Sequence, residues 1–429
     1  SVLFGTTPGT NVTILSDTQL TVRVPAGSGT VDVRVKSGRD ATGVPQNVNN
    51  PVFGYGVSAV TTADRFTYGT SPPPPLPPPP GSPPPPPSVP LPGSPPSPPA
   101  PPGSPPAPPA PGRVREFAAG SDRGFGSVQL YNPDGSLRFT AAPFGPTFAG
   151  GVRTVAADFN RDGVADLVAG TGPGGPTRVV ILDGVTQDVL FSTDPFEAAF
   201  TGGVYVAAGD LDGDGRADLI VTPDEGGGPR VQVYGGAGLA KLADFFGIDD
   251  ASFRGGARAA LGDVNADGYA DLVVSAGFGG GPRVALFDGR SVAGGGRAKL
   301  ADDFFLFEQA LRNGAFVAVG DVDGDGYGDL VGGGGPGGGP RVYALAGRDL
   351  LAGTSRVLAN FFAGNVENRG GVRVAVKDLD GDTRADVVVG DGTGAGSRVT
   401  AYGGAALTAG AAMLGFDAFP GQLAGVFVG

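Results

Sequence analysis

The chain has 429 residues, with 79 glycines and 42 prolines, and it contains no cysteine, histidine or tryptophan. The absence of cysteine and histidine excludes disulfides, thiolate nucleophiles, imidazole bases and metal sites built on thiolate or imidazole. Acidic residues outnumber basic ones by 42 to 30, and the formal charge of −12 argues against nucleic acid and anionic membranes as partners. No run of about 18 apolar residues occurs, so no membrane span is expected.

The acidic residues are almost all aspartate, with 37 Asp against 5 Glu. Aspartate favours turns, caps and metal loops, whereas glutamate favours helices. Together with a glycine content near one residue in five, this predicts an all-β protein with many tight loops. Any bound metal must have oxygen ligands, which restricts the candidates to Ca²⁺, Mg²⁺ or Mn²⁺.

Residues 1–70 form a first predicted module. The segments SVLFGTT, NVTILS, QLTVRVP, GTVDVRVKS and DRFTYG alternate apolar and polar residues, as sandwich strands do. They resemble the later part of a TIG/IPT immunoglobulin-like domain, whose early strands would precede Ser1. Two interpretations stay open: a fragment or processed start, or a sandwich whose missing strands come from another molecule.

Residues 71–112 form a proline-rich segment in which 26 of 42 residues are proline. Proline lacks the backbone N–H and has a fixed φ, so the segment is predicted to form a polyproline II rod that rises ~3.1 Å per residue. It acts either as a semi-rigid spacer or as an ordered rod that packs or carries glycans on its serines.

Residues 113–429 contain an internal repeat. Five related segments begin at Asp158, Asp210, Asp263, Asp321 and Asp378, at intervals of 52, 53, 58 and 57 residues. Each lies between two short apolar strands, and each is followed by a glycine-rich turn, a third strand and a fourth strand rich in phenylalanine. Four short strands in ~50 residues are typical of a β-propeller blade.

The two ends of this region are predicted to make one further blade. Residues 115–140 match the second to fourth strands of a blade, and the final GQLAGVFVG matches a first strand. We therefore expect a six-bladed propeller with one blade split between the chain ends, which closes the ring and leaves no open edge.

Each repeated segment follows the pattern D-x-[DN]-x-[DN]-G-x-x-D, which predicts a cation site. Oxygen ligands fall at positions 1, 3, 5 and 9, a backbone carbonyl is expected at position 7, and glycine at position 6 permits the turn. The five expected ligand sets, about five Ca²⁺ sites in all, are Asp158, Asn160, Asp162, Val164 and Asp166; Asp210, Asp212, Asp214, Arg216 and Asp218; Asp263, Asn265, Asp267, Tyr269 and Asp271; Asp321, Asp323, Asp325, Tyr327 and Asp329; and Asp378, Asp380, Asp382, Arg384 and Asp386.

The charge distribution supports calcium sites. The alternative is a set of hairpin turns that contain Asp and Gly for conformational reasons and bind no metal. These loops contain 18 of the 42 acidic residues, and clustered carboxylates repel one another unless a cation lies between them. Loop five has Thr383 in place of glycine, so we expect a strained turn and the weakest site there.

The aspartate loops, the F-x-G-G lead-ins such as Phe148–Gly151 and the G-G-P-R-V turns resemble FG-GAP/VCBS repeats. Such repeats form the calcium-binding propeller blades of integrin α-subunits and many bacterial surface proteins. The resemblance implies an extracellular, calcium-stabilised propeller used for adhesion, recognition or surface assembly. The chain departs from the best-known integrin propellers, which have seven blades.

Two further repeated features have structural explanations. Arginine recurs at the head of the third strand, where it either braces a neighbouring Asp loop or carbonyl or belongs to a ring that binds an anionic ligand. Phenylalanine recurs in and after the fourth strand, and we expect these side chains in the core between blades. The two sets are Arg178, Arg230, Arg283, Arg341 and Arg398, and Phe144, Phe148, Phe196, Phe200, Phe245, Phe246, Phe304, Phe305, Phe361 and Phe362.

The sequence therefore predicts a non-enzymatic, extracellular or cell-surface protein with a structural or adhesive role, including that of a filament subunit. Its expected partners are other copies of itself or surface proteins, and glycans are further candidates. A lectin-like propeller is the alternative, although only Tyr269 and Tyr327 place an aromatic ring in the loops. An enzyme is disfavoured because the clustered acids are all assigned to metal loops.

Overall fold

The computed structural model describes residues 2–4, 7–8, 10–14, 20–25, 30–37, 56–57, 65–67 and 114–429. The chain divides into two compact units, Ser1–Pro99 and Ala100–Gly429. The predicted polyproline II rod lies outside the described residues, and the predicted domain boundaries remain predictions. Within the described residues, no helix is long and apolar enough to span a bilayer.

The N-terminal unit contains only short antiparallel strands in its described parts. One sheet has the order β2-β1-β5-β6 with β7 also paired to β5, and β3 pairs with β4 separately. The strands are β1 (Val2–Phe4), β2 (Thr7–Pro8), β3 (Thr10–Ile14), β4 (Leu20–Arg23), β5 (Thr30–Ser37), β6 (Gly56–Val57) and β7 (Arg65–Thr67). The immunoglobulin-like sandwich remains a prediction.

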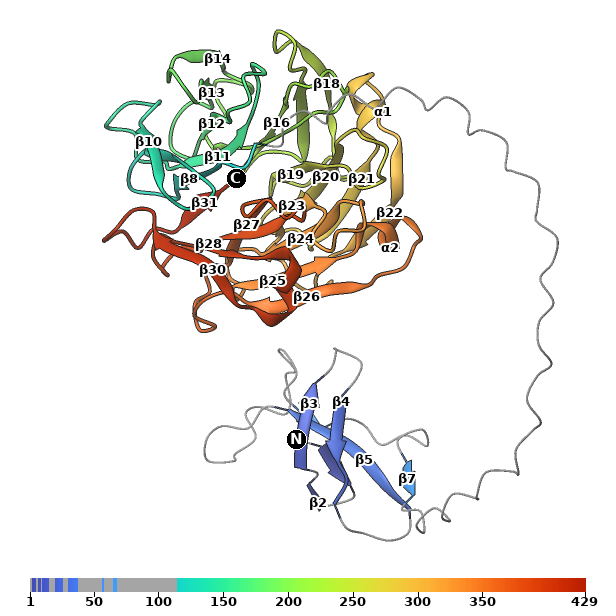
Figure 1. The fold of residues 1–429 in the computed structure, drawn as a ribbon. Coiled ribbons are helices and arrows are strands. Elements are labelled where there is room, and N and C mark those ends of the chain that lie inside the picture. Colours follow the sequence, from blue (N-terminus) through green and yellow to red (C-terminus); the bar gives the residue numbers. More distant parts are fainter. Residues whose placement is uncertain are drawn as a thin grey trace, which may run out of the picture. The chain divides into compact units, whose positions relative to one another are not determined.

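Residues 114–429 form a six-bladed β-propeller, as predicted (Figure 1). Five blades are continuous antiparallel four-stranded sheets in chain order. Their strands are β11 (Val152–Ala157), β12 (Asp166–Thr171), β13 (Val179–Leu182) and β14 (Val189–Thr193); β15 (Val204–Gly209), β16 (Asp218–Pro223), β17 (Arg230–Tyr234) and β18 (Lys241–Phe246); β19 (Ala257–Gly262), β20 (Asp271–Ala276), β21 (Arg283–Phe287) and β22 (Lys299–Phe305); β23 (Ala315–Gly320), β24 (Asp329–Gly334), β25 (Arg341–Leu345) and β26 (Val357–Phe362); and β27 (Val372–Lys377), β28 (Asp386–Asp391), β29 (Arg398–Tyr402) and β30 (Ala412–Asp417).

The remaining blade is the predicted split blade, with the strand order β10-β9-β8-β31. Its first strand, β31 (Val426–Val428), comes from the C-terminus, and the others are β8 (Phe117–Ser121), β9 (Val128–Tyr131) and β10 (Leu137–Ala141). Val426 pairs with Ser121 and Val428 with Ala119, so the two ends of the propeller sequence close the ring. In Figure 1 the C-terminus lies beside β31, near the middle of the ring.

The burial of the strands follows their place in the blade. The second strand of each continuous blade is almost wholly buried, whereas fourth strands such as β14 and β30 alternate between exposed and partly exposed residues. Neighbouring blades pack through Val, Ala, Leu and Phe side chains into clusters that cross blade boundaries. Short helical turns follow the third strand in three blades: α1 (Gly289–Ala293), α2 (Gly347–Leu351) and the 3₁₀ helix η1 (Gly404–Ala409).

Candidate metal centre

The five aspartate motifs all occupy the same place in their blades, the turn between the first and second strands. The aspartate at position 9 begins the second strand and pairs with the last residue of the first, as in Ala157↔Asp166 and Gly320↔Asp329. Because this geometry repeats in every continuous blade, the five loops lie at one end of the propeller.

Side-chain oxygens at positions 1, 3 and 5 fold each loop onto itself. In the second blade, Asp210 accepts hydrogen bonds from the backbone N–H groups of Gly213 and Gly215, at 2.7 and 2.9 Å. Asp212 accepts from the N–H of Asp214 at 3.0 Å, and Asp214 accepts from that of Arg216 at 2.8 Å. A carboxylate oxygen has a second lone pair, so these bonds leave acceptor capacity for a cation.

The aspartate at position 9 is buried and holds the loop against its blade. One oxygen accepts from the backbone N–H of position 2 at 2.7–2.9 Å in all five loops. The other accepts from a backbone N–H that lies 18 residues further along the chain, at 2.5–3.0 Å. The members are Asp166, Asp218, Asp271, Asp329 and Asp386, each at most 1 % exposed.

Burial changes the titration of these carboxyl groups when no cation is present. It raises the pKa of Asp166, Asp218 and Asp271 to about 6 and that of Asp329 to about 7, although backbone N–H donors act in the opposite direction. Burial also raises the pKa of Asp386. A nearby cation would favour the charged form, so these side chains fit a site that is completed by a metal ion.

Carboxylate oxygens converge most closely in three loops. Three side chains in each bring an oxygen within 4.8 Å of the others: Asp210, Asp212 and Asp218; Asp321, Asp323 and Asp325; and Asp378, Asp380 and Asp386. In the first and third blades Asn160 and Asn265 replace the acid at position 3, and no carboxylate triplet within that limit is found there among the described residues. The all-oxygen set suits calcium in each loop.

The other predicted ligands lie in the same five turns. Asp158, Asp162, Asp263, Asp267 and Asp382 make the same hydrogen bonds to loop N–H groups as their counterparts in the second blade. Position 7 is occupied by Val164, Arg216, Tyr269, Tyr327 and Arg384, whose carbonyls remain predicted ligands.

Two positions in each loop have a left-handed backbone, and only position 6 was predicted to do so. At position 6, Thr383 has φ +77°, where the other loops have glycine, as predicted. Position 4 is also left-handed, and it is occupied by Arg161 at φ +66° and Ala266 at φ +61° in two loops. Glycine at this position in the other three loops was the sequence feature that indicated the requirement.

Neighbouring loops are joined to one another by hydrogen bonds. The N–H at position 8 donates to the carbonyl of position 1 in the preceding blade, as Ala217 does to Asp158 at 2.9 Å and Ala385 to Asp321 at 2.6 Å. At the split blade, which has no such loop, the Arg115 side chain donates to the Asp378 carbonyl at 2.8 Å. The five loops and Arg115 thus form a belt linked from blade to blade.

Position 7 side chains strengthen this belt. Arg216 donates to the carbonyl of Phe159 in the preceding loop at 3.0 Å, and Arg384 donates to that of Asp323 at 2.5 Å. Loop four also has a cationic neighbour, because Arg356 forms an ion pair with Asp323 at 2.8 Å.

The recurrent arginines at the third strand have a structural role, but their partners are not the metal loops. Arg178 pairs with Asp194, Arg230 with Asp244 and Arg283 with Asp303, each at or just after the fourth strand of the same blade. The interpretation as bracing is therefore supported, with the outer strand rather than a loop as the braced element.

The expectation for the repeated phenylalanines is wrong for one subset. Phe196 is buried between blades, but Phe246, Phe305 and Phe362 are 42–53 % exposed. They are the last residues of fourth strands, opposite Arg230, Arg283 and Arg341 in the register, where no further strand covers them.

The two loop tyrosines contact protein groups. Arg290 lies over the Tyr269 ring at 4.6 Å from its centroid, and Arg348 lies over the Tyr327 ring at 5.6 Å. A guanidinium over a ring leaves less of the ring surface available for stacking with a sugar. The two tyrosines therefore do not support the lectin-like alternative.

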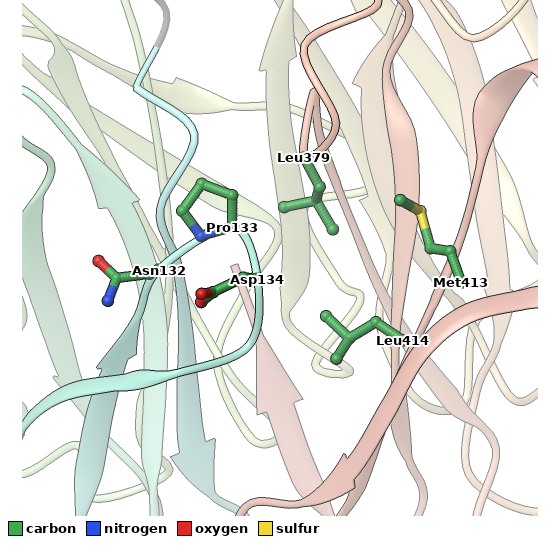
Figure 2. A pocket seen from close by; sticks show the side chains of 6 residues that line it. All are labelled: Asn132, Pro133, Asp134, Leu379, Met413 and Leu414. Atoms are coloured by element: carbon green, nitrogen blue, oxygen red, sulfur yellow. The ribbon is translucent and has the colours of Figure 1, made fainter.

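A cavity of about 460 Å³ lies beside loop five (Figure 2). Its lining consists of Asn132, Pro133 and Asp134 from the split blade and of Leu379, Met413 and Leu414 from the neighbouring blade. Asp134 is the only acid in this lining, and hydrogen bonds from Ser136 lower its pKa. A single carboxylate in this lining offers no acid–base pair.

Comparison with known proteins agrees with the repeat analysis. Residues 115–169 and 210–274 match the family described as FG-GAP-like repeat, and residues 255–297 match the FG-GAP repeat. The matched segments of the propeller are therefore similar to FG-GAP repeats. The chain is 26 % identical to integrin alpha-V of Gallus gallus over 51 % of its length, and 29 % identical to integrin alpha-5 of Xenopus laevis over 42 %. It spans 23 % and 19 % of these relatives, about a fifth of their length.

Among solved structures, the propeller is similar to a chain of a nidogen/laminin complex. The identity is 13 %, the TM-score is 0.42, and the match covers 73 % of this chain and 98 % of that chain. The rhamnogalacturonan lyase YesW matches with 13 % identity and a TM-score of 0.37, over 71 % of this chain and 63 % of that chain.

Proposed function

We propose that this protein is a non-enzymatic, extracellular surface protein whose FG-GAP propeller is stabilised by calcium and acts in adhesion or surface assembly. The observation that carries the proposal is the belt of five aspartate loops at one end of the propeller. Calcium bound there would neutralise carboxylates that otherwise crowd together, and it would fix the turns that link each blade to the next.

The adhesive role is supported by the repeat family and by the likeness to integrin α-subunits. A ring closed by a split blade provides a rigid platform, which suits a protein that presents its surface to partners. Other copies of the chain or other surface proteins are the partners in this proposal, and the three exposed phenylalanines at the blade edges offer apolar contact area.

The absence of enzymatic activity is part of the proposal. The buried acids of the loops are engaged by backbone N–H groups, and the 460 Å³ cavity beside loop five contains one acid. General acid–base catalysis by carboxylates needs two groups with separated pKa values that face a common substrate.

Self-association and its calcium dependence test the adhesive role. Light scattering and negative-stain imaging of the full chain should show assemblies in millimolar calcium that dissociate when EDTA is added. The variant Asp188→Asn, at an exposed turn outside the loops, is the matched control and should assemble like the unmodified chain. A monomer under both conditions that also fails to bind other surface proteins would contradict the adhesive role.

A further inference from the structure

The second residue of every innermost strand points to the propeller axis and follows a simple alternation. Three arginines alternate with three aromatic residues around the ring: Arg153, Tyr205, Arg258, Phe316, Arg373 and Phe427. The arrangement therefore has an approximate threefold repeat inside a six-bladed ring, which we call the axial layer.

Stacking holds the axial layer together. The rings of Tyr205, Phe316 and Phe427 contact one another pairwise, with centroids 5.9–6.1 Å apart. Each arginine lies against the two rings that flank it, and the closest approach is that of Arg258 to Phe316, at 3.8 Å from the centroid. A guanidinium stacked on a ring keeps its N–H donors in its own plane, free to bond at its edge.

Two of the three buried arginines have a carboxylate partner. Arg153 bonds Asp224 at 2.8 Å, and Arg373 bonds Asp122 at 2.7 Å. Both acids directly follow the second strand of the next blade. For Arg258 the next blade has Gly335 at this place, so the threefold repeat lacks its third acid.

Arg258 is consequently a buried cation without a counter-ion among the described residues. The residue is as buried as Arg153, at 4 % exposed. The Nε atoms of all three arginines lack a hydrogen-bond partner, but only in Arg258 does the buried Nη1 atom lack one as well. Nη1 of Arg153 and Arg373 bonds the carbonyls of Gly150 and Gly370, but Arg258 makes no equivalent bond. An unpaired buried charge is strongly destabilising, so an anion bound beside the Arg258 guanidinium would stabilise the folded state.

The axial layer surrounds a cavity of about 60 Å³ that Arg258 lines together with its stacking partners. This volume holds a few waters or one small anion, and it is too small for a peptide or a sugar. We propose that the axial cavity binds one small monovalent anion, a halide or a free carboxylate of formate size, against the guanidinium of Arg258.

The counter-ion has to come from solution. At Gly335 an added Cβ would collide with the carbonyl oxygen of Asn313, so the fourth blade cannot supply the missing acid without a backbone shift. Water in the cavity would satisfy the N–H donors but would leave the charge of Arg258 uncompensated. A bound anion accepts hydrogen bonds from the N–H donors and also compensates the charge of Arg258. Together with three arginines and two aspartates, one monovalent anion makes the axial layer neutral.

Thermal unfolding in exchanged anions tests the site. The full chain is melted in calcium gluconate with sodium gluconate, whose anion exceeds the cavity, and then with chloride, bromide or formate at equal ionic strength. At about 100 times Kd, a small anion should raise Tm by roughly 4 °C. If only halides raise Tm, the axial cavity accepts a monoatomic ion alone. If formate raises Tm as well, the cavity also accepts a small carboxylate.

Two variants decide whether Arg258 is responsible. Arg258→Met removes the unpaired charge, so it should melt higher than the unmodified chain in gluconate and should not respond to halides. Arg178→Met, at an exposed ion pair on the outer strand, should keep the full halide response. An equal halide response in Arg258→Met would overturn the proposal.

A direct measurement covers the case in which Arg258→Met does not fold. Crystals of the unmodified chain soaked in bromide should show an anomalous peak within hydrogen-bond distance of Arg258 Nε or Nη1. Absence of bromide from the axial cavity, with no change in Tm on halide addition, would refute the site.

Discussion

Thr383 adopts a backbone conformation that threonine rarely takes, with φ +77° at position 6 of loop five. A β-branched side chain in the left-handed region is strained by about 1–2 kcal/mol. Thr383→Gly should therefore increase the free energy of unfolding by about 1 kcal/mol after the greater chain entropy of glycine is subtracted, as measured by denaturant unfolding.

The reverse exchange in loop four is the matched control. Gly326 has φ +88°, and an added Cβ there would meet no atom within 4 Å, so only backbone strain is introduced. Gly326→Thr should lower the free energy of unfolding by about 1 kcal/mol, since the backbone strain is partly offset by the lower chain entropy of threonine in the unfolded state. If both exchanges leave the free energy of unfolding unchanged, backbone strain at position 6 does not affect the stability of the propeller.

The aspartates at position 9 make the stability of the calcium-free protein depend on pH. Burial raises the pKa of Asp329 to about 7, whereas an unfolded aspartate titrates near ~4. Between these values the folded state keeps a proton that the unfolded state has released, so stability falls as pH rises from about 4 to about 7. In EDTA, the melting temperature should therefore be higher at pH 5 than at pH 8.

Asp329→Asn cannot titrate and should flatten this pH profile in part, since Asp166, Asp218 and Asp271 keep raised pKa values. Calcium should also flatten it, because the ion displaces the protons. A calcium-free melting temperature that rises from pH 5 to pH 8 would contradict the assigned environment of these side chains.

At the residue scale, the sequence predicted the loops but not every role within them. The spacing of Asp and Asn identified all five turns, and the threonine in place of glycine indicated the strain at Thr383. It did not reveal that position 9 bonds two backbone N–H groups, because the second donor lies 18 residues further along the chain. The alternation of Arg and aromatic residues in the first strands is present in the sequence. It repeats only every second blade, so an alignment of single repeats does not show it.

At the element scale, β31 closes the ring with three residues. Val426 and Phe427 are 0 and 5 % exposed, and the strand covers the inner edge of β8. Removing residues 426–429 should destabilise the propeller by roughly 5–8 kcal/mol through lost apolar burial, and it should promote aggregation through the uncovered edge. Denaturant unfolding and light scattering measure the two effects.

A substitution just before β31 shows whether the loss of stability comes from removing the closing strand or from any change near the C-terminus. Leu423 is 70 % exposed just before β31, so Leu423→Ser should change the free energy of unfolding by less than about 0.5 kcal/mol. A truncated chain that unfolds like the full chain would show that β31 does not contribute to closure.

Blade number and closure were predictable because each blade is a local unit of four antiparallel strands with its own sequence repeat. The outer edges were less predictable: Phe246 and Phe305 share the aromatic pattern of buried phenylalanines, and only the register shows that they end an uncovered strand. The sandwich of residues 1–70 and the rod of residues 71–112 remain predictions.

At the scale of the whole molecule, calcium is expected to act on the propeller as one unit. The loops are hydrogen-bonded from blade to blade, so an ion bound in one loop also orders the turn of its neighbour. With affinities of the extracellular class, ~10⁻⁴–10⁻³ M, removal of calcium from millimolar solution should lower Tm by on the order of 10 °C. An unchanged melting curve in EDTA would exclude a stabilising role for the metal.

The most direct test of the account is the amount of calcium that the propeller holds. The full chain is equilibrated by dialysis against millimolar calcium, and bound calcium is measured by elemental analysis of protein and dialysate, beside a variant with Asp212→Asn and Asp214→Asn in one loop. The five aspartate loops predict about five ions per chain and about one fewer in the variant. No bound calcium, or an equal amount in both proteins, would contradict the assignment of these loops as metal sites.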